Sequence, residues 1–206
     1  MKPKVLPKGM WSKSIHYFYS LKNQSYCWCE SMLERDALLL MEFDDDIEAY
    51  KTQPISIQYK NSSGKISRYT PDYLYKRKSR TRPGFHEVKM AARVDDELLN
   101  KLALVNVRVK KAYGTQLEII SDTEIRIGSR IDNLMSLYSY RRFDINNSDA
   151  VRLLNNMPSE FCYGDLINHA KRLGAKNVTP LALLAHGRLT FDTTTHLLAG
   201  TKIFKK

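Results

Sequence analysis

Cysteine is scarce in this sequence, and long apolar runs are missing from it. The three cysteines, Cys27, Cys29 and Cys162, form neither an even disulfide set nor the paired C-x-x-C spacing of a zinc site. No apolar run approaches the roughly 20 residues that a membrane-spanning helix requires. Met1 to Lys8 is basic and lacks the apolar segment of a signal peptide. We therefore expect a cytoplasmic protein.

Acidic residues are sparse where positive charge is densest. The net charge is +11, and residues 60–93 contain ten Lys or Arg against only two acids, Asp72 and Glu87. Residues 31–59 instead contain seven acids and two bases. A basic run is most often a solvated loop, but one that surrounds carboxylates is typical of an enzyme acting on nucleic acid. Binding to a membrane surface or to heparin would not require the acids.

Two short strands flank the basic run. Residues 72–75 and 85–89 both alternate with period two, and residues 76–84 have the length and Pro-Gly chemistry of a hairpin connection. Folding this hairpin brings Asp72 towards Glu87 and Lys89, and we expect the loop cations to lie beside these three residues. The expected loop cations are Lys76, Arg77, Lys78, Arg80 and Arg82.

This combination suits metal-assisted attack on a phosphodiester. Carboxylate oxygens bind Mg²⁺, the metal activates water, and a lysine offsets charge on the phosphate. Taken alone, Pro71-Asp72 also fits a turn, and Glu87-x-Lys89 also fits an exposed salt-bridged strand.

The surrounding pattern predicts an α/β fold with a mixed sheet. A helix begins at Ser31, where Ser31-x-x-Glu34 reads as a capping box in which Glu34 reaches back to the Ser31 amide. Strands follow at 47–50 and 55–59, and Asn61 to Gly64 turns the chain into the Asp72 strand. A long amphipathic helix over 94–109 then leads to a strand at 117–120. A right-handed crossover makes this last strand parallel to the Glu87 strand.

This αβββαβ order, with its acids and lysine, resembles the PD-(D/E)xK nuclease superfamily. Within it, the chain resembles TnsA, the endonuclease subunit of heteromeric transposases, over about residues 30–140. The motifs that carry this resemblance are Ser31-x-x-Glu34, Gln53-Pro54, Tyr69-x-Pro71-Asp72, Glu87-Val88-Lys89 and Asp122-Thr123-Glu124-Ile125.

The resemblance implies a Mg²⁺-dependent endonuclease that also accepts Mn²⁺. It makes Asp72, Glu87 and the Val88 carbonyl the metal ligands, with Glu34 binding the metal directly or through water. Lys89 would orient the attacking water, and Gln53 would support the site. The DNA-binding residues would be the five loop cations with Lys65, Arg68 and Arg93. Implied partners are transposon-end DNA, a TnsB-like transposase and a TnsC-like AAA+ ATPase; the enzyme would hydrolyse the 5′ ends of the element.

We expect four segments in the chain. Residues 1–30 form a basic, aromatic segment packed on the core, 31–122 the nuclease core, and 123–143 a connecting helix. Residues 144–206 form the small winged-helix-like domain that the resemblance implies, with a wing built from 189–191 and 197–204. Its third helix, from Thr179-Pro180 to near Gly187, has no basic or amide side chain to read bases, which favours docking of a partner protein.

Two other functions remain open. A stand-alone restriction or repair nuclease would have the same acids and lysine, but it would cut DNA unaided. A non-catalytic DNA-binding module would explain the charge and leave the convergence of the acids as coincidence. Cleavage with and without a partner transposase separates these alternatives.

Overall fold

The computed structural model describes residues 15–155 and 157–206, which form two compact units. One unit comprises the described residues up to Leu38 and Glu48–Asp122, and the other comprises Leu39–Ile47 and Thr123–Lys206. The helix α1 (Met32–Phe43) therefore contributes to both. The predicted N-terminal segment spans residues 1–30, and its residues 1–14 lie outside the part of the chain that the structure describes. No helix in the described ranges combines the length and apolarity needed to cross a membrane.

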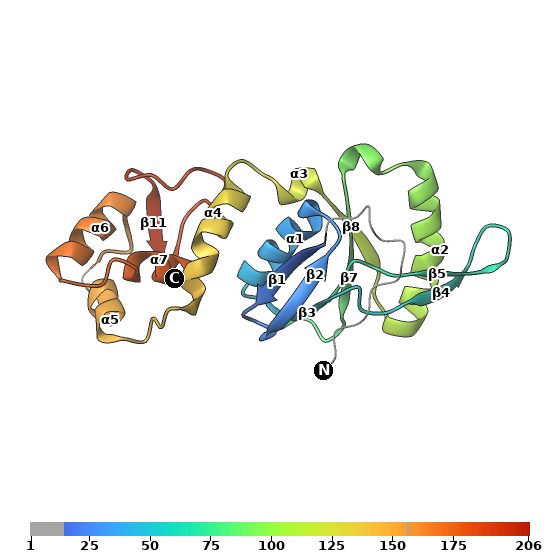
Figure 1. Cartoon of the computed structure of the whole chain (residues 1–206), viewed down its shortest axis with the longest axis horizontal. Coiled ribbons are helices and arrows are strands. Elements are labelled where there is room, and N and C mark those ends of the chain that lie inside the picture. Colours follow the sequence, from blue (N-terminus) through green and yellow to red (C-terminus); the bar gives the residue numbers. More distant parts are fainter. Residues whose placement is uncertain (1–14, 156) are drawn as a thin grey trace. The chain divides into compact units, whose positions relative to one another are not determined.

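The first unit is built on a four-stranded mixed sheet with strand order β3-β6-β7-β8 (Figure 1). Its members are β3 (Ile47–Thr52), β6 (Tyr73–Arg77), β7 (Gly84–Lys89) and β8 (Leu117–Ser121). The strand β7 pairs antiparallel with β6 and parallel with β8. The predicted mixed sheet and the parallel last strand are confirmed.

Two hairpins accompany this sheet, and the sequence interpretation missed their pairing. The strands β1 (His16–Ser20) and β2 (Ser25–Cys29) pair with each other, as do β4 (Ile57–Lys60) and β5 (Ile66–Tyr69). The turn after β4 was predicted to lead into the Asp72 strand, and this is wrong. It leads into β5, and the chain leaves strand conformation at Thr70–Asp72, where Pro71 has no N–H to donate to a ladder.

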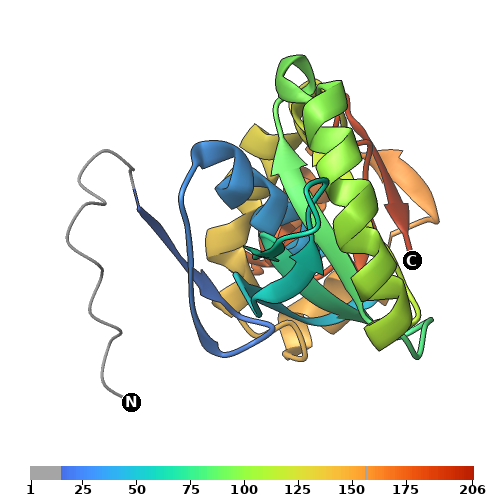
Figure 2. The ribbon, with the colours of Figure 1, turned by 90° about the vertical axis from the view of Figure 1, so that its right-hand side faces the viewer.

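Helix α2 (Asp96–Tyr113) covers one face of β7 and β8 (Figure 2). Asp95 caps its start by accepting from the Leu98 amide, and Gly114 ends it in the left-handed conformation. The 3-10 turn η1 (Ala91–Arg93) joins β7 to this helix. The fully buried Phe85 packs with α2 residues spaced along one helical face, namely Leu102, Val105 and Val109. This packing fixes which side chains of β7 face the helix.

The second unit combines helices with a three-stranded sheet of order β10-β11-β9. Its sheet strands are β9 (Glu160–Cys162), β10 (Leu189–Thr190) and β11 (Lys202–Lys205). Its helical elements are α3 (Asp122–Ile125), α4 (Arg130–Tyr138), η2 (Ser139–Arg142), α5 (Ser148–Asn155), α6 (Tyr163–Arg172) and α7 (Thr179–Ala185). Residues 123–143, predicted as a connection, lie within this compact unit, and β9 was not predicted.

Gly84 supplies a test of how β6 and β7 pack. It lies opposite Tyr75, and a Cβ added to Gly84 would sit 2.1 Å from the Tyr75 ring. We expect Gly84→Ala to lower the free energy of unfolding by about 1–3 kcal/mol because the buried ring must move. Thermal denaturation measures this. Gly200→Ala is the matched control, since an added Cβ there meets nothing within 4 Å. An equal effect of both substitutions would contradict the packing.

Candidate active site

The site begins with Asp72 and Glu87, which the strand register places opposite each other. Tyr73 pairs with His86 and Tyr75 pairs with Gly84, so the residue before β6 faces Glu87 across the hairpin. Asp72 Oδ2 accepts a hydrogen bond of 2.8 Å from the Val88 amide, one residue beyond Glu87. Glu87 is buried, with 5% of its surface exposed. Two carboxylates are thus held together in a poorly solvated place.

Lys89 lies two residues after Glu87 on the same face of β7. Its Nζ is 2.5 Å from Glu87 Oε1, and its side chain is one-third exposed. Burial disfavours the charged ammonium, but the hydrogen bond and negative charge of Glu87, together with Asp72 and Glu34, raise the pKa of Lys89. Lys89 is therefore a cation at neutral pH, positioned between the acids and solvent.

Burial and charge repulsion also act on Asp72. Burial first, and then the negative charge of Glu87, raise the pKa of Asp72 from 3.8 to about 7, although the Val88 hydrogen bond opposes the shift. A close pair of poorly solvated carboxylates is costly even when partly compensated, as here by Lys89 and the Val88 amide, and a bound cation relieves this cost. The pair therefore has the electrostatic character of a cation-binding site.

Glu34 lies near this pair but is engaged in capping α1. Its Oε1 accepts from the Ser31 hydroxyl and its Oε2 from the Glu30 amide, one residue earlier than the predicted Ser31 amide. Tyr73 Oη donates to the Glu34 carbonyl, which ties α1 to β6. Among the described residues, no three His, Cys, Asp or Glu side chains gather closely enough to hold a metal. Glu34 is thus a neighbour of the Asp72–Glu87 pair and does not complete a cluster with it.

Tyr69 belongs to the site and was absent from the predicted site residues. Its hydroxyl and Glu87 Oε2 are both buried, and neither has a hydrogen-bond partner within residues 15–155 and 157–206. Burial and the adjacent Glu87 carboxylate raise the pKa of Tyr69 well above its ordinary value. An orphaned carboxylate oxygen beside a second carboxylate is a donor set of hard oxygens that suits Mg²⁺ or Mn²⁺. The residues present therefore fit a divalent cation.

The basic loop does not lie beside the acids, and this prediction is wrong. Asp72 and Glu87 stand at one end of the β6–β7 hairpin, and the loop closes the other end, beyond the Tyr75–Gly84 pair. Three residue pairs separate the two ends of this ladder, a distance of roughly 10 Å. In a hairpin, the connecting loop lies at one end of the paired strands and the free strand ends lie at the other. A count of charges along the sequence does not show which residues lie at which end.

The loop cations have partners of their own. Lys76 pairs with Glu48 at 2.9 Å, Arg77 lies over the Tyr75 ring, and Arg82 donates to the Gly114 carbonyl. Lys78 and Arg80 are exposed at the loop surface.

Other cations are located on different elements. Arg93 is exposed in η1, four residues after Lys89, and Arg68 is exposed on β5 next to Tyr69. Lys65 is exposed at the turn before β5. Lys101 of α2, which was not predicted, places its Nζ 4.9 Å from the centre of the Tyr69 ring. An i, i+3 reading of α2 from Leu98 could have found it as the residue beside the buried helical face.

Gln53 lies against the backbone of Asp72. Its amide donates to the Asp72 carbonyl at 2.8 Å, and its own φ of 41° is unusual for a residue other than glycine. The support that Gln53 gives is thus made through its main chain, which fixes where β6 begins.

Residues 44–122 match the family described as TnsA-like endonuclease N terminal. The matched range includes Gln53, Asp72, Glu87, Val88 and Lys89, and it leaves out Glu34 and everything after Asp122. None of the curated proteins compared with the chain matches it. The resemblance predicted from the sequence motifs over about residues 30–140 is confirmed for residues 44–122.

The raised pKa of Asp72 makes stability depend on pH. Between pH 3.8 and about 7 the folded protein keeps a proton on Asp72 that the unfolded chain has lost, so stability falls as pH rises through this range. We expect Asp72→Asn to raise the melting temperature at pH 8, by an amount worth a few kcal/mol at most. The asparagine oxygen can still accept from the Val88 amide.

The measurement is thermal denaturation of both proteins from pH 4 to pH 8 in the presence of a chelator. The difference between them should shrink towards pH 4, because near the ordinary pKa of 3.8 the unfolded chain also begins to bind the proton. A difference that stays constant with pH would contradict the assignment of this titration to Asp72.

Proposed function

We propose that this chain, in which residues 44–122 match the family described as TnsA-like endonuclease N terminal, is a divalent-metal-dependent DNA endonuclease. It hydrolyses the 5′ ends of a transposon during cut-and-paste excision, together with a TnsB-like transposase and in the cytoplasm. The observation that carries this proposal is the placement of Asp72 opposite Glu87, with Lys89 bound to Glu87, inside the matched domain.

Asp72, Glu87 and the Val88 carbonyl would hold Mg²⁺, with Mn²⁺ as a substitute. When bound, the cation supplies activation of the attacking water and stabilisation of the leaving oxygen. Glu87 contributes a buried oxygen with no protein partner among the described residues. Asp72 is held in place by the Val88 amide, so the same short segment of β7 orients both carboxylates.

Lys89 donates from Nζ to the attacking water and to a non-bridging phosphate oxygen. Its raised pKa keeps the ammonium protonated, and its partly exposed position gives it access to the phosphate. Fixed positive charge at the place where negative charge develops lowers the barrier to hydrolysis. Glu34 acts through water, because both of its carboxylate oxygens already accept hydrogen bonds in the cap of α1.

DNA would contact the protein in two places. Arg68, Arg93 and Lys101 lie on segments adjoining the carboxylates, where they can bind phosphates near the scissile bond. Lys78 and Arg80, at the far end of the β6–β7 hairpin, would contact the duplex away from the cut. The site then positions DNA with cations that take no part in the chemistry.

The second unit would be a winged-helix-like module that docks the partner transposase or a TnsC-like AAA+ ATPase. The order α5, β9, α6, α7, β10, β11 and the placement of β11 between the other two strands support this proposal. In α7 nearly every side chain is buried, from Thr179 to Ala185. A helix that is committed to the core has no face left with which to read bases, which favours a protein as the partner.

The alternative of a stand-alone nuclease has the same site and differs in its need for a partner. A TnsA-like subunit should be nearly silent alone and active with its transposase, whereas a restriction or repair nuclease should cut unaided. A non-catalytic DNA-binding module gives no reason for two opposed, buried carboxylates.

We expect Asp72→Ala to abolish Mg²⁺-dependent 5′-end cleavage, because it removes a metal ligand. Lys89→Ala should slow cleavage by roughly 10²–10³-fold, since it removes one stabilising donor. Cleavage of end-labelled donor DNA, with and without the partner transposase, measures both effects. Glu97→Ala is the matched control, because Glu97 is an exposed carboxylate in the first turn of α2. Undiminished cleavage by the Asp72 variant would refute the proposed function.

The loop cations should affect binding and leave the chemistry unchanged. We expect the double variant Lys78→Ala, Arg80→Ala to weaken DNA binding and to lower the salt dependence of log K by about 2, one unit for each lost phosphate contact. The cleavage rate at saturating DNA should stay the same, because this loop is remote from the acids. Fluorescence anisotropy over a salt series measures binding, with exposed Lys171→Ala as the control. A slower rate at saturation would place the loop in the catalytic machinery.

A further inference from the structure

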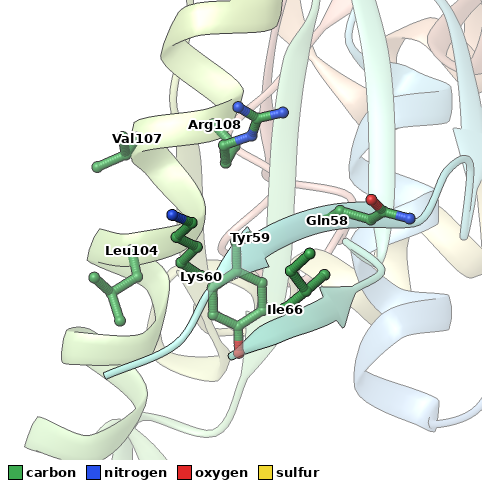
Figure 3. Close-up of a pocket in the computed structure, with 7 residues that line it drawn as sticks. All are labelled: Gln58, Tyr59, Lys60, Ile66, Leu104, Val107 and Arg108. Atoms are coloured by element: carbon green, nitrogen blue, oxygen red, sulfur yellow. The ribbon is translucent and has the colours of Figure 1, made fainter. Parts of the chain in front are cut away.

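A groove of about 380 Å³ lies between the β4–β5 hairpin and α2 (Figure 3). Its lining includes Tyr59 and Lys60 from β4, Ile66 from β5, and Leu104, Val107 and Arg108 from α2. This volume falls in the range of about 300–1,000 Å³ that is typical of ligand sites. The groove shares no lining residue with the carboxylate site.

Apolar side chains stand exposed along this groove. Ile66 is 73% exposed and Val107 is 66% exposed, among the highest values for large apolar residues in the described chain. Beneath them, Tyr59 and the partly buried Leu104 belong to the hydrophobic core that joins the hairpin to α2. Exposed apolar residues that adjoin a groove, and do not stand singly, mark an interaction site.

The hairpin and the part of α2 after its first turn carry positive charge and no acid. The hairpin, residues 57–69, contains Lys60, Lys65 and Arg68, and α2 from Leu98 to Tyr113 contains Lys101, Arg108, Lys110 and Lys111. The acids of α2 are confined to its first turn. Of these cations, Lys60 and Arg108 line the groove itself, and with no carboxylate among the lining residues they favour a negatively charged occupant.

We propose that this groove binds an acidic, amphipathic segment of a partner protein. Apolar side chains of the segment would pack on Ile66, Leu104 and Val107, and its carboxylates would pair with Lys60 and Arg108. The apolar and the basic side chains of the groove would then both contact the segment, as is usual in grooves that bind peptides. The proposal does not depend on the nuclease assignment.

Duplex DNA fits this surface less well. Its phosphates would pair with Lys60 and Arg108, but its backbone offers nothing apolar to cover Ile66 and Val107. A second copy of the chain fits poorly too. The acid-rich stretch Glu42–Glu48 has only Phe43 and Ile47 as apolar residues; Ile47 is buried, and Phe43 is partly buried against the core of its own unit.

The test uses random peptides displayed on phage and selected on the full chain. We expect the enriched peptides to combine Asp or Glu with Leu, Ile or Phe. Synthetic versions should lose at least about 10-fold in affinity for Arg108→Glu, since a charge contact becomes repulsive. Their affinity for Val107→Ser should be several-fold lower than for the unchanged chain. The salt dependence of binding should stay the same, since that contact is apolar.

Matched controls are Lys171→Glu and Val151→Ser, which alter an exposed lysine and a half-exposed valine in the second unit. Circular dichroism and melting temperature establish that all four variants fold. The proposal would be overturned if no selected peptide depended on Arg108 and Val107 for binding. It would also be overturned if the selected peptides were neutral or basic.

Two further measurements decide between occupants. A labelled DNA duplex whose affinity falls as much with Val107→Ser as the peptide's does would assign the groove to DNA and overturn the proposal. A dimer in sedimentation velocity that dissociates in Arg108→Glu would assign it to a second copy. If neither Val107→Ser nor Arg108→Glu changes DNA binding or self-association, the result supports a protein partner. Because none of these readouts is cleavage, failure here is distinguishable from failure of the nuclease assignment.

Discussion

Two negative charges are held opposite each other in a poorly solvated part of the β6–β7 hairpin, and the first unit is arranged to tolerate them. The strand register places Asp72 across from Glu87, the Val88 amide holds the first, and the Lys89 ammonium holds the second. These contacts offset only part of the repulsion, since the pKa of Asp72 is still raised to about 7. A site with this residual cost gains stability when a cation binds, which couples metal binding to the order of the strands.

The carboxylate pair and the basic loop lie at different ends of the β6–β7 hairpin, which separates the proposed chemistry from the proposed DNA positioning. Glu87 and Lys89 lie at one end of β7, and the basic loop lies beyond the other end. Arg82 is tied to the end of α2 through the Gly114 carbonyl, and Lys76 is tied to Glu48, so the loop is partly held by neighbouring elements. Cations near the carboxylates come instead from η1, β5 and α2. Substrate binding and catalysis can therefore vary independently in this fold.

Surfaces for other proteins are also separate from the carboxylate pair. The second unit buries α7 in its own core, together with Leu153, Leu166 and Ile203. The groove between the β4–β5 hairpin and α2 uses a face that the catalytic residues do not share.

Much of the fold could be predicted from the sequence, because local patterns carry it. The alternation at 85–89, the Asp95 to Gly114 helix signals and the parallel last strand are properties of short segments and their connections. The sequence motifs also indicated the family that the comparison confirmed over residues 44–122. The hairpins β1–β2 and β4–β5 were missed as paired units, since pairing depends on partners as well as on pattern.

The candidate site shows the same limit. The sequence by itself determined that Asp72, Glu87 and Lys89 would converge, because a hairpin with a given register leaves little choice. Only the tertiary structure decided that the basic loop lies away from them, that Glu34 is occupied in a helix cap, that Tyr69 adjoins Glu87, and that Lys101 lies over the Tyr69 ring. The physical reason is that charge and hydrogen bonding act through space, and contacts between distant segments arise from packing that no local pattern encodes.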